Sequence, residues 1–178
     1  GHSYDVMMEQ AGQALADAII ERYPVEELRV LVLVGPGNNG GDGLVAGRYL
    51  AEAGADVAFY LYKDREPEKD ANYRQIQEMD LFTVTAEFDQ RYRVLRTRLA
   101  ITDLVIDALL GTGVSRPIGG DLARLLKQVA SGIDERRAEL TPHAKLTSLT
   151  AYSGGAEAQG GRGEGSPLPL RTSTPLPV

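Results

Sequence analysis

In the first part of the chain, segments with a helical spacing of hydrophobic residues alternate with nearly continuous hydrophobic runs. Over residues 5–22 apolar residues recur every three or four positions, which predicts a helix with one buried face that ends before Pro24. Residues 28–34, LRVLVLV, form a nearly continuous aliphatic run that is typical of a strand buried on both faces of a parallel sheet. A Gly-rich turn over 35–43 follows, and a second helical pattern continues from 44 to 53.

The same alternation of strands and helices continues to about residue 130. We expect strands at 57–62, 81–85 and 104–109, and helices at 66–79, 88–99 and 122–129. This order predicts an α/β fold, a three-layer Rossmann-like domain with a mostly parallel central sheet. Ligands of such folds bind at the carboxyl ends of strands, so the Gly-rich segments that follow two of the strands form the candidate site.

The regular pattern stops near Ile133. We therefore expect one domain over 1–133 and an irregular or disordered tail over 134–178. Residues 153–178 contain 6 Gly and 4 Pro among 26 residues, a composition that buries too little apolar surface to offset the entropy of ordering. The alternative is an ordered loop that lies over the surface of the domain.

Composition excludes several classes of function. The 178 residues carry a net charge of −6, which makes a nucleic-acid or anionic-membrane binder a poor hypothesis. The chain has no Cys and only 2 His, so disulfides, thiolate zinc sites and a Ser/His/Asp triad are not expected. No apolar run reaches the ~18 residues of a membrane span, and no signal peptide is recognisable. We expect a cytoplasmic protein.

The first Gly-rich segment, GPGNNGGDG, lies between a predicted strand and a predicted helix. Its backbone N–H groups and the helix N-terminus would form a site for phosphate. Its glycine spacing also fits the dinucleotide fingerprint, with Asp64 as a ribose-binding acid. An ordinary dehydrogenase is nevertheless disfavoured, because no catalytic His, Tyr/Lys pair or second domain is visible. Asn38, Asn39 and Asp42 are not required by that fingerprint; they bind a ligand or satisfy the backbone of the turn itself.

The second Gly-rich segment, DALLGTGVSRPIGG, covers residues 107–120. Asp107 lies in an apolar strand, where a carboxylate is costly unless it is paired, hydrogen-bonded or bound to a cation. The alternative is that Asp107 caps the turn that follows. Thr112, Ser115 and Arg116 suit a ribose or a phosphate, although an arginine on a loop is also compatible with a solvated side chain.

Three segments of the chain resemble a known family. MMEQAG (7–12), VLVGPGNNGGDGLVAGRYL (32–50) and DLVIDALLGTGVSRPIGG (103–120) are similar to the signature segments of the YjeF N-terminal domain family. The resemblance covers about residues 4 to 131, in order and at family-like spacing. Enzymatic members of this family are NAD(P)H-hydrate epimerases.

The resemblance implies an isomerase of nicotinamide nucleotide repair. NADH or NADPH hydrated at C6 of the nicotinamide ring would be interconverted between its R and S epimers, so that a separate dehydratase, which accepts the S form, can repair both. The family is also associated with homodimers. The substrate-binding residues carried over by motif are Asn38, Asn39, Gly40, Gly41, Asp42, Gly111, Thr112, Gly113, Val114, Ser115, Arg116 and Pro117.

The resemblance also implies a potassium ion held by Asn39 and Asp107. Potassium is a hard monovalent cation that prefers carboxylate, amide and backbone oxygens to nitrogen or sulfur, so these residue types suit it.

Two departures from the family pattern qualify this hypothesis. The family has a further helix before the segment that matches Met7. It also has a strand and loop of the type VD-x-PSG, whose Asp is a candidate acid/base and whose Ser completes the potassium site; this chain contains no such segment. We therefore assign no catalytic residue and expect an epimerase with impaired activity. The alternative is a non-catalytic module for nucleotide binding or dimerisation.

Overall fold

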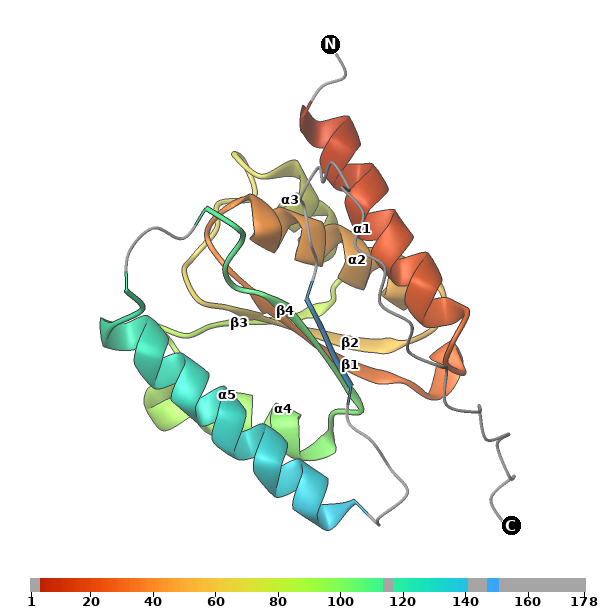
Figure 1. The fold of residues 1–178 in the computed structure, drawn as a ribbon. Coiled ribbons are helices and arrows are strands. Elements are labelled where there is room, and N and C mark those ends of the chain that lie inside the picture. Colours follow the sequence, from red (N-terminus) through yellow and green to blue (C-terminus); the bar gives the residue numbers. More distant parts are fainter. Residues whose placement is uncertain (1–3, 114–116, 141–146, 151–178) are drawn as a thin grey trace, which may run out of the picture.

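The computed structural model describes residues 4–113, 117–140 and 147–150. Five helices and five strands alternate along this part of the chain (Figure 1). The helices are α1 (Tyr4–Ile20), α2 (Asn38–Glu52), α3 (Ala71–Glu78), α4 (Arg93–Ile101) and α5 (Gly120–Glu139), with the short 3₁₀ helices η1 (Val25–Glu27) and η2 (Gln90–Tyr92). The strands are β1 (Arg29–Val34), β2 (Asp56–Leu61), β3 (Phe82–Thr85), β4 (Leu104–Ala108) and β5 (Thr147–Thr150).

The strands form one sheet in the order β3-β2-β1-β4-β5, and every neighbouring pair is parallel. Helices α1, α2 and α3 lie on one face of the sheet, and α4 and α5 lie on the other (Figure 1). The expected three-layer α/β architecture is therefore confirmed. The chain moves outward from β1 to β3 and then returns to place β4 on the other side of β1, so the crevice of this fold lies between the carboxyl ends of β1 and β4.

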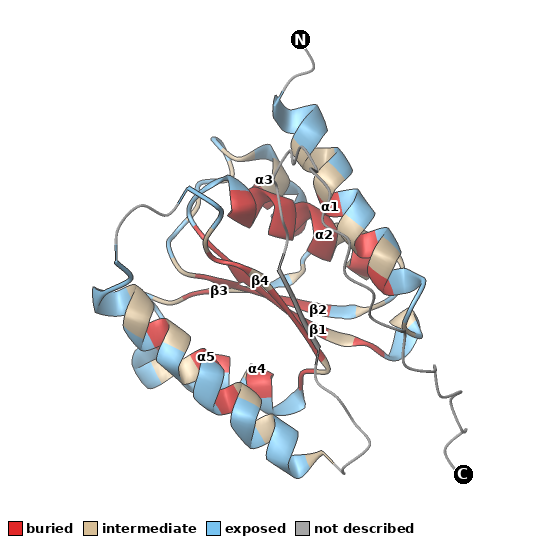
Figure 2. Ribbon diagram, viewed as in Figure 1, coloured by how far each residue is buried: buried red, intermediate tan, exposed pale blue. Residues whose placement is uncertain are grey.

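The core consists of two apolar layers, one on each face of the sheet. Val30, Val32 and Val34 of β1 contribute to the layer under α1, α2 and α3. Leu31 and Leu33 contribute to the layer under α4 and α5. Both layers are continuous with the buried centre of the sheet in Figure 2, which explains why the sequence of β1 lacks polar alternation.

Two expected helix boundaries were wrong. A helix was expected over 66–79, but α3 begins only at Ala71, because the side chain of Asp70 accepts a hydrogen bond of 3.0 Å from the N–H of Tyr73 and caps the helix there. The expected helix over 88–99 is divided into η2 and α4, because Arg91 and Tyr92, the last two residues of η2, have a φ of 56°.

The expected domain boundary at Ile133 falls inside α5, which continues to Glu139. Asp134, Glu135, Arg137 and Glu139 are exposed on this helix, whereas the side chain of Arg136 is only 15% exposed and forms an ion pair of 3.4 Å with Asp103. Residues 147–150 then add β5 beside β4. Regular structure therefore extends beyond the expected end of the domain, while the rest of the expected tail, 151–178, lies outside the described residues.

None of the helices in the described residues is long and apolar enough to cross a membrane.

Candidate functional site

Helix α2 begins inside the first Gly-rich segment. The segment was expected to be a turn up to Gly43, but helical structure already starts at Asn38, with Gly37 as the N-cap residue. No side chain caps this end of the helix, and its first turn contains no acidic residue. The free N–H groups and the positive end of the helix dipole therefore remain available for an anion.

Four of the five glycines of this segment, Gly35, Gly40, Gly41 and Gly43, are needed for close packing rather than for unusual backbone angles. None of them has a positive φ. A Cβ atom on Gly40 would lie 2.1 Å from the carbonyl oxygen of Gly35, and one on Gly35 would lie 1.9 Å from that of Leu109. The start of α2 thus lies directly on the ends of β1 and β4, and any side chain at these positions would separate them.

Arg65, which the sequence analysis did not select, anchors the same segment. Its Nη2 donates to the carbonyl oxygens of Gly35 at 2.6 Å and Gly37 at 2.8 Å. Its Nη1 pairs with the carboxylate of Asp70. Because β2 neighbours β1, a basic residue just after β2 can reach the loop after β1; this topological position is the signal that could have identified it.

A cavity of about 470 Å³ opens in front of the N-terminus of α2. Its walls come from the loops after β1 and β4 and from the start of α1, and its volume lies within the usual range for small-molecule sites. The lining residues are Tyr4, Pro36, Gly37, Asn38, Asn39, Leu109, Leu110, Gly111, Thr112 and Gly113. The two Gly-rich segments therefore meet at one cavity.

The side chain of Asn39 joins these two segments. It is only 5% exposed, and its Nδ2 donates to the carbonyl oxygen of Leu110 at 3.1 Å. Its Oδ1 is buried without a hydrogen-bond partner among the described residues. A buried amide oxygen without a donor is costly, so this atom is a candidate ligand atom for a cation or a substrate N–H or O–H.

Asp42 is buried but does not line the cavity. It is 3% exposed, and its Oδ2 has no partner in the part of the chain that the structure describes. Burial raises the pKa of this carboxyl above its ordinary value of 3.8. The structure thus separates Asp42 from Asn38 and Asn39, which reach the cavity.

Asp107 lies near the end of β4, in register with Leu33 of β1. Its Oδ1 accepts a hydrogen bond of 3.0 Å from the N–H of Leu109, which is the turn-capping role that was left open as an alternative. In register with Leu33, Asp107 belongs to the face covered by α4 and α5, whereas Asn39 approaches from the face of α2. The two residues therefore approach the carboxyl ends of β1 and β4 from opposite faces of the sheet.

The oxygen chemistry of these residues fits a monovalent cation. The unpartnered Oδ1 of Asn39 and the carboxylate of Asp107 are hard ligands. No group of three or more His, Cys, Asp or Glu able to hold a metal ion occurs in the described ranges.

The remaining site residues have different positions. Gly40 and Gly41 are buried and do not line the cavity, and a Cβ atom on Gly41 would meet Sδ of Met8 at 2.3 Å. Pro117 is exposed and does not line the cavity. Val114, Ser115 and Arg116 lie outside the described residues.

Strand β5 lies next along the chain after α5, but it does not supply the VD-x-PSG strand and loop of the family pattern. The strand that follows α5 is formed by residues 147–150, which read TSLT and contain neither the Asp nor the rest of the VD-x-PSG pattern. The residues directly after this strand lie outside the described part of the chain.

The chain has extensive similarity to known proteins. It is 36% identical over 124 residues to "NAD(P)H-hydrate epimerase" of Limosilactobacillus fermentum, covering 70% of this chain and 56% of that protein. It is 34% identical over 128 residues to "NAD(P)H-hydrate epimerase" of Entamoeba histolytica, covering 70% and 53%. It is also 34% identical over 134 residues to "Bifunctional NAD(P)H-hydrate repair enzyme Nnr" of Thermofilum pendens, covering 72% and 25%.

The match therefore spans about half the length of the two epimerases and a quarter of the bifunctional enzyme. Among solved structures, the crystal structure of yeast ynu0 shares the fold, with a TM-score of 0.68 and 21% identity over 85% of this chain and 61% of that one. Residues 4–150 match the family described as "YjeF-related protein N-terminus". This family match contains both Gly-rich segments and all five strands, and the chain belongs to the family of proteins with a YjeF-related N-terminus.

Proposed function

We propose that this domain binds hydrated NADH or NADPH and interconverts the R and S epimers of the hydrated nicotinamide ring. The observation that carries the proposal is the uncapped N-terminus of α2 facing a cavity that both Gly-rich segments line. The names of the similar proteins from Limosilactobacillus fermentum and Entamoeba histolytica support the substrate class.

In this proposal the chain's own residues mainly bind and orient the nucleotide. The N–H groups at the start of α2 would hold a phosphate, while Arg65 fixes the carbonyl oxygens of Gly35 and Gly37 and so keeps these N–H groups directed at the cavity. Asn38, Asn39 and Thr112 would contact the polar groups of the substrate. Ser115 and Arg116 belong to the same proposed loop but are not described by the structure.

Asn39 and Asp107 would hold a potassium ion. When bound, the ion would supply positive charge beside the anionic nucleotide. The buried, unpartnered Oδ1 of Asn39 is the structural support for this assignment. Loss of nucleotide affinity in buffers that contain tetramethylammonium in place of potassium, together with a lowered affinity in Asn39→Ala that no longer depends on potassium, would support it.

Epimerisation requires proton transfer and hence a positioned acid or base. The sequence contains no VD-x-PSG segment, and Asp42 does not line the cavity. We therefore expect this chain to accelerate the reaction less than a relative with that segment, by about 10²- to 10⁴-fold, the usual contribution of a general acid/base.

The test is a coupled assay. R-NADH-hydrate is mixed with an excess of an S-specific dehydratase, and the formation of NADH is followed with and without this chain. Acceleration above the spontaneous rate supports the epimerase. Nucleotide binding measured by calorimetry without any acceleration would favour the alternative, a non-catalytic binding module. The absence of both nucleotide binding and acceleration would refute both functions.

Two partner proposals accompany this function. The bifunctional name of the Thermofilum pendens relative supports a functional link to an NAD(P)H-hydrate dehydratase. A homodimer, implied by the family resemblance, is tested by light scattering of the purified chain, with the mass of a monomer as the opposing result.

A further inference from the structure

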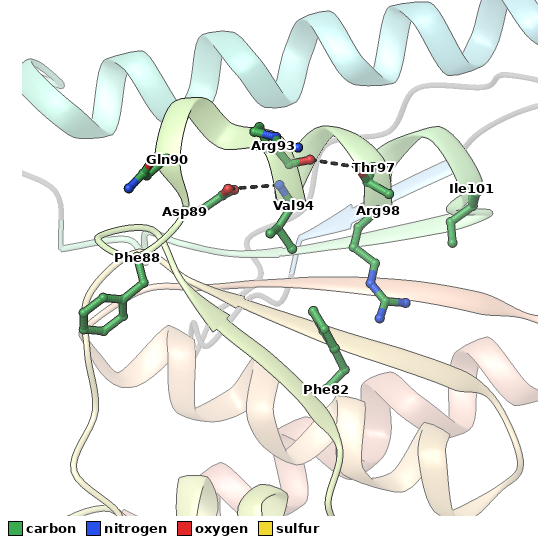
Figure 3. Close-up of a pocket in the computed structure, with 9 residues that line it drawn as sticks. All are labelled: Phe82, Phe88, Asp89, Gln90, Arg93, Val94, Thr97, Arg98 and Ile101. Atoms are coloured by element: carbon green, nitrogen blue, oxygen red, sulfur yellow. Dashed lines mark hydrogen bonds between the residues drawn. The ribbon is translucent and has the colours of Figure 1, made fainter.

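A second cavity lies far from the Gly-rich segments, between β3 and α4. It has a volume of about 660 Å³, and we call it the α4 groove. Because β3 forms one edge of the sheet, this groove is separated by β2 from the crevice between β1 and β4. Figure 3 shows the lining side chains Phe82, Phe88, Asp89, Gln90, Arg93, Val94, Thr97, Arg98 and Ile101.

The α4 groove exposes apolar surface that the domain does not need for its own core. Helix α4 uses Leu95 and Leu99 to pack on the sheet. Its groove side includes Ile101, which is 40% exposed, while Phe82 and Phe88 across the groove are 40% and 73% exposed. Exposed aromatic and aliphatic side chains gathered along one groove are typical of a binding surface.

The groove is also cationic. Arg93 and Arg98 line it, and α4 together with η2 carries two further arginines, Arg91 and Arg96, within a stretch that has no acidic residue. Among the described residues none of these four arginines forms an ion pair with a carboxylate. The chain as a whole has a net charge of −6, so this cationic surface contrasts with the rest of the protein.

Asp89, the carboxylate among the lining residues, does not offset this charge at the groove surface. It is buried, and its oxygens accept hydrogen bonds from the hydroxyl of Tyr60 at 3.1 Å and from the N–H groups of Val94 at 2.9 Å and Leu95 at 3.0 Å. These contacts fix the start of α4 on the sheet. Arg98, by contrast, is held over the ring of Phe82, with its Cζ 3.9 Å from the ring centroid, so its charge is positioned beside an apolar surface.

The shape of the groove suits an extended chain. β3 pairs only with β2 in the described sheet, which leaves the hydrogen-bonding groups of its outer edge for another strand. Arg93 and Arg98 are five residues apart on α4, or ~7.5 Å along the helix. Two residues of an extended chain span a similar ~6.6 Å, so acidic residues at alternate positions would match the two arginines.

We propose that the α4 groove binds an extended acidic segment of a partner protein, in which acidic residues alternate with aromatic or aliphatic ones. The acidic residues pair with Arg93 and Arg98, and the apolar residues pack on Phe82 and Phe88. A second copy of this chain docked through the same groove would bring arginines opposite arginines, so charge favours a different, acidic partner. The proposal does not depend on the epimerase function.

The test uses the full 178-residue chain and a capped, fluorescently labelled peptide, Gly-Glu-Phe-Glu-Leu-Glu-Phe-Gly, followed by fluorescence anisotropy. The control peptide carries Lys in place of each Glu. The variant Arg93→Glu/Arg98→Glu is compared with Arg91→Glu/Arg96→Glu, which changes the net charge equally but outside the groove. Phe88→Ser provides a third variant, since its exposed ring contributes little to folding.

We expect saturable binding of the acidic peptide and none of the lysine peptide. The groove variant and Phe88→Ser should each weaken binding at least about tenfold, as for central contacts of an interface, while the control variant retains it. Equal loss in both double variants would show diffuse charge attraction and overturn the proposal. So would binding confined to anionic phosphatidylserine vesicles, or a dimer that dissociates on Arg98→Glu, because each assigns the groove to another occupant.

Discussion

Gly37 and Gly40 both lie in the first Gly-rich segment but have opposite surroundings. A Cβ atom on Gly37 would have no neighbour within 4 Å, whereas one on Gly40 would lie 2.1 Å from a backbone carbonyl oxygen. Gly37 also has a φ of −94°, which any residue adopts. The two positions therefore allow substrate binding to be changed separately from folding.

We expect Gly37→Ala to lower the free energy of unfolding by no more than about 1 kcal/mol, because alanine is a poorer N-cap residue than glycine but meets no steric obstacle here. Its methyl group lies at the cavity, so binding of NADPH-hydrate should weaken about tenfold. Gly40→Ala should cost about 1–3 kcal/mol of stability, because the close contact must open. Thermal denaturation and calorimetry check both; equal loss of stability in the two variants would show that the segment is not packed as described.

The buried carboxyl of Asp42 makes stability depend on pH. Burial raises its pKa above 3.8 in the folded state, so its contribution to stability is fully present below that value and is lost as the pH rises through the folded pKa. Asp42→Asn removes this loss. We expect the variant to gain stability relative to the native chain between about pH 4 and pH 7.

Denaturant titrations across this pH range check the prediction for Asp42. The control is Asp64→Asn at an exposed position. A difference between Asp42→Asn and the native chain that does not change with pH would show that the carboxyl is not desolvated.

Between elements, one ion-pair cluster joins the strands at their amino ends to α5. Arg29 at the start of β1 donates from Nε and Nη2 to the two carboxylate oxygens of Asp103, both at 2.8 Å. Arg136 of α5 approaches the same carboxylate at 3.4 Å. Burial alone would raise the pKa of Asp103, but the hydrogen bonds and charge of Arg29, with a smaller effect of Arg136, lower it.

A lowered folded pKa means that the stability from Asp103 is present above the ordinary value of 3.8 and is lost as the pH falls through the folded pKa. We expect Asp103→Asn to cost about 1–2 kcal/mol at pH 7, in line with a partly exposed but bidentate pair. The cost should shrink toward zero near about pH 2. Equilibrium unfolding at several pH values measures it, and a cost that is constant with pH would contradict the charge-based explanation.

Some helices and strands could be predicted from the hydrophobic pattern of the sequence, and others could not. The buried strands β1 and β4 and the amphipathic α1 could be predicted because a single property, continuous or periodic apolar positions, determines them. The start of α2 could not, because Gly40 and Gly43 were interpreted as part of a turn, whereas they lie within the helix and make close contacts at the ends of β1 and β4. Propensity describes the isolated residue, and here tertiary packing decides.

From the sequence, the loops that form the candidate site could be predicted, but the positions of their side chains could not. Two Gly-rich segments after parallel strands were expected to share a crevice, and the cavity lined by Asn38, Asn39 and Gly111 confirms that they meet. Side-chain direction was not predictable: Asp42 is buried and does not line the cavity, and Arg65 anchors the first Gly-rich segment from the loop after β2. Both depend on contacts between segments that sequence periodicity does not report.

The sheet gives an expectation for the whole chain. Both core layers and the five strands that the structure describes lie within residues 4–150. A chain ended after Thr150 should therefore have an unfolding temperature within about 3 °C of the 178-residue chain, equivalent to less than about 1 kcal/mol. Differential scanning calorimetry checks this, with a chain ended after Glu139, which removes β5, as the comparison that should be less stable.

The pairing of β1 with β4 also determines when the sheet can be completed. Val30 of β1 lies beside Leu104 of β4, so about seventy residues must leave the ribosome after β1 before its second neighbour exists. During that interval one edge of the most apolar strand has no partner, and unpaired strand edges promote association between chains. Newly synthesised chains of this protein are therefore most prone to aggregation after β3 has emerged and before β4 has been made.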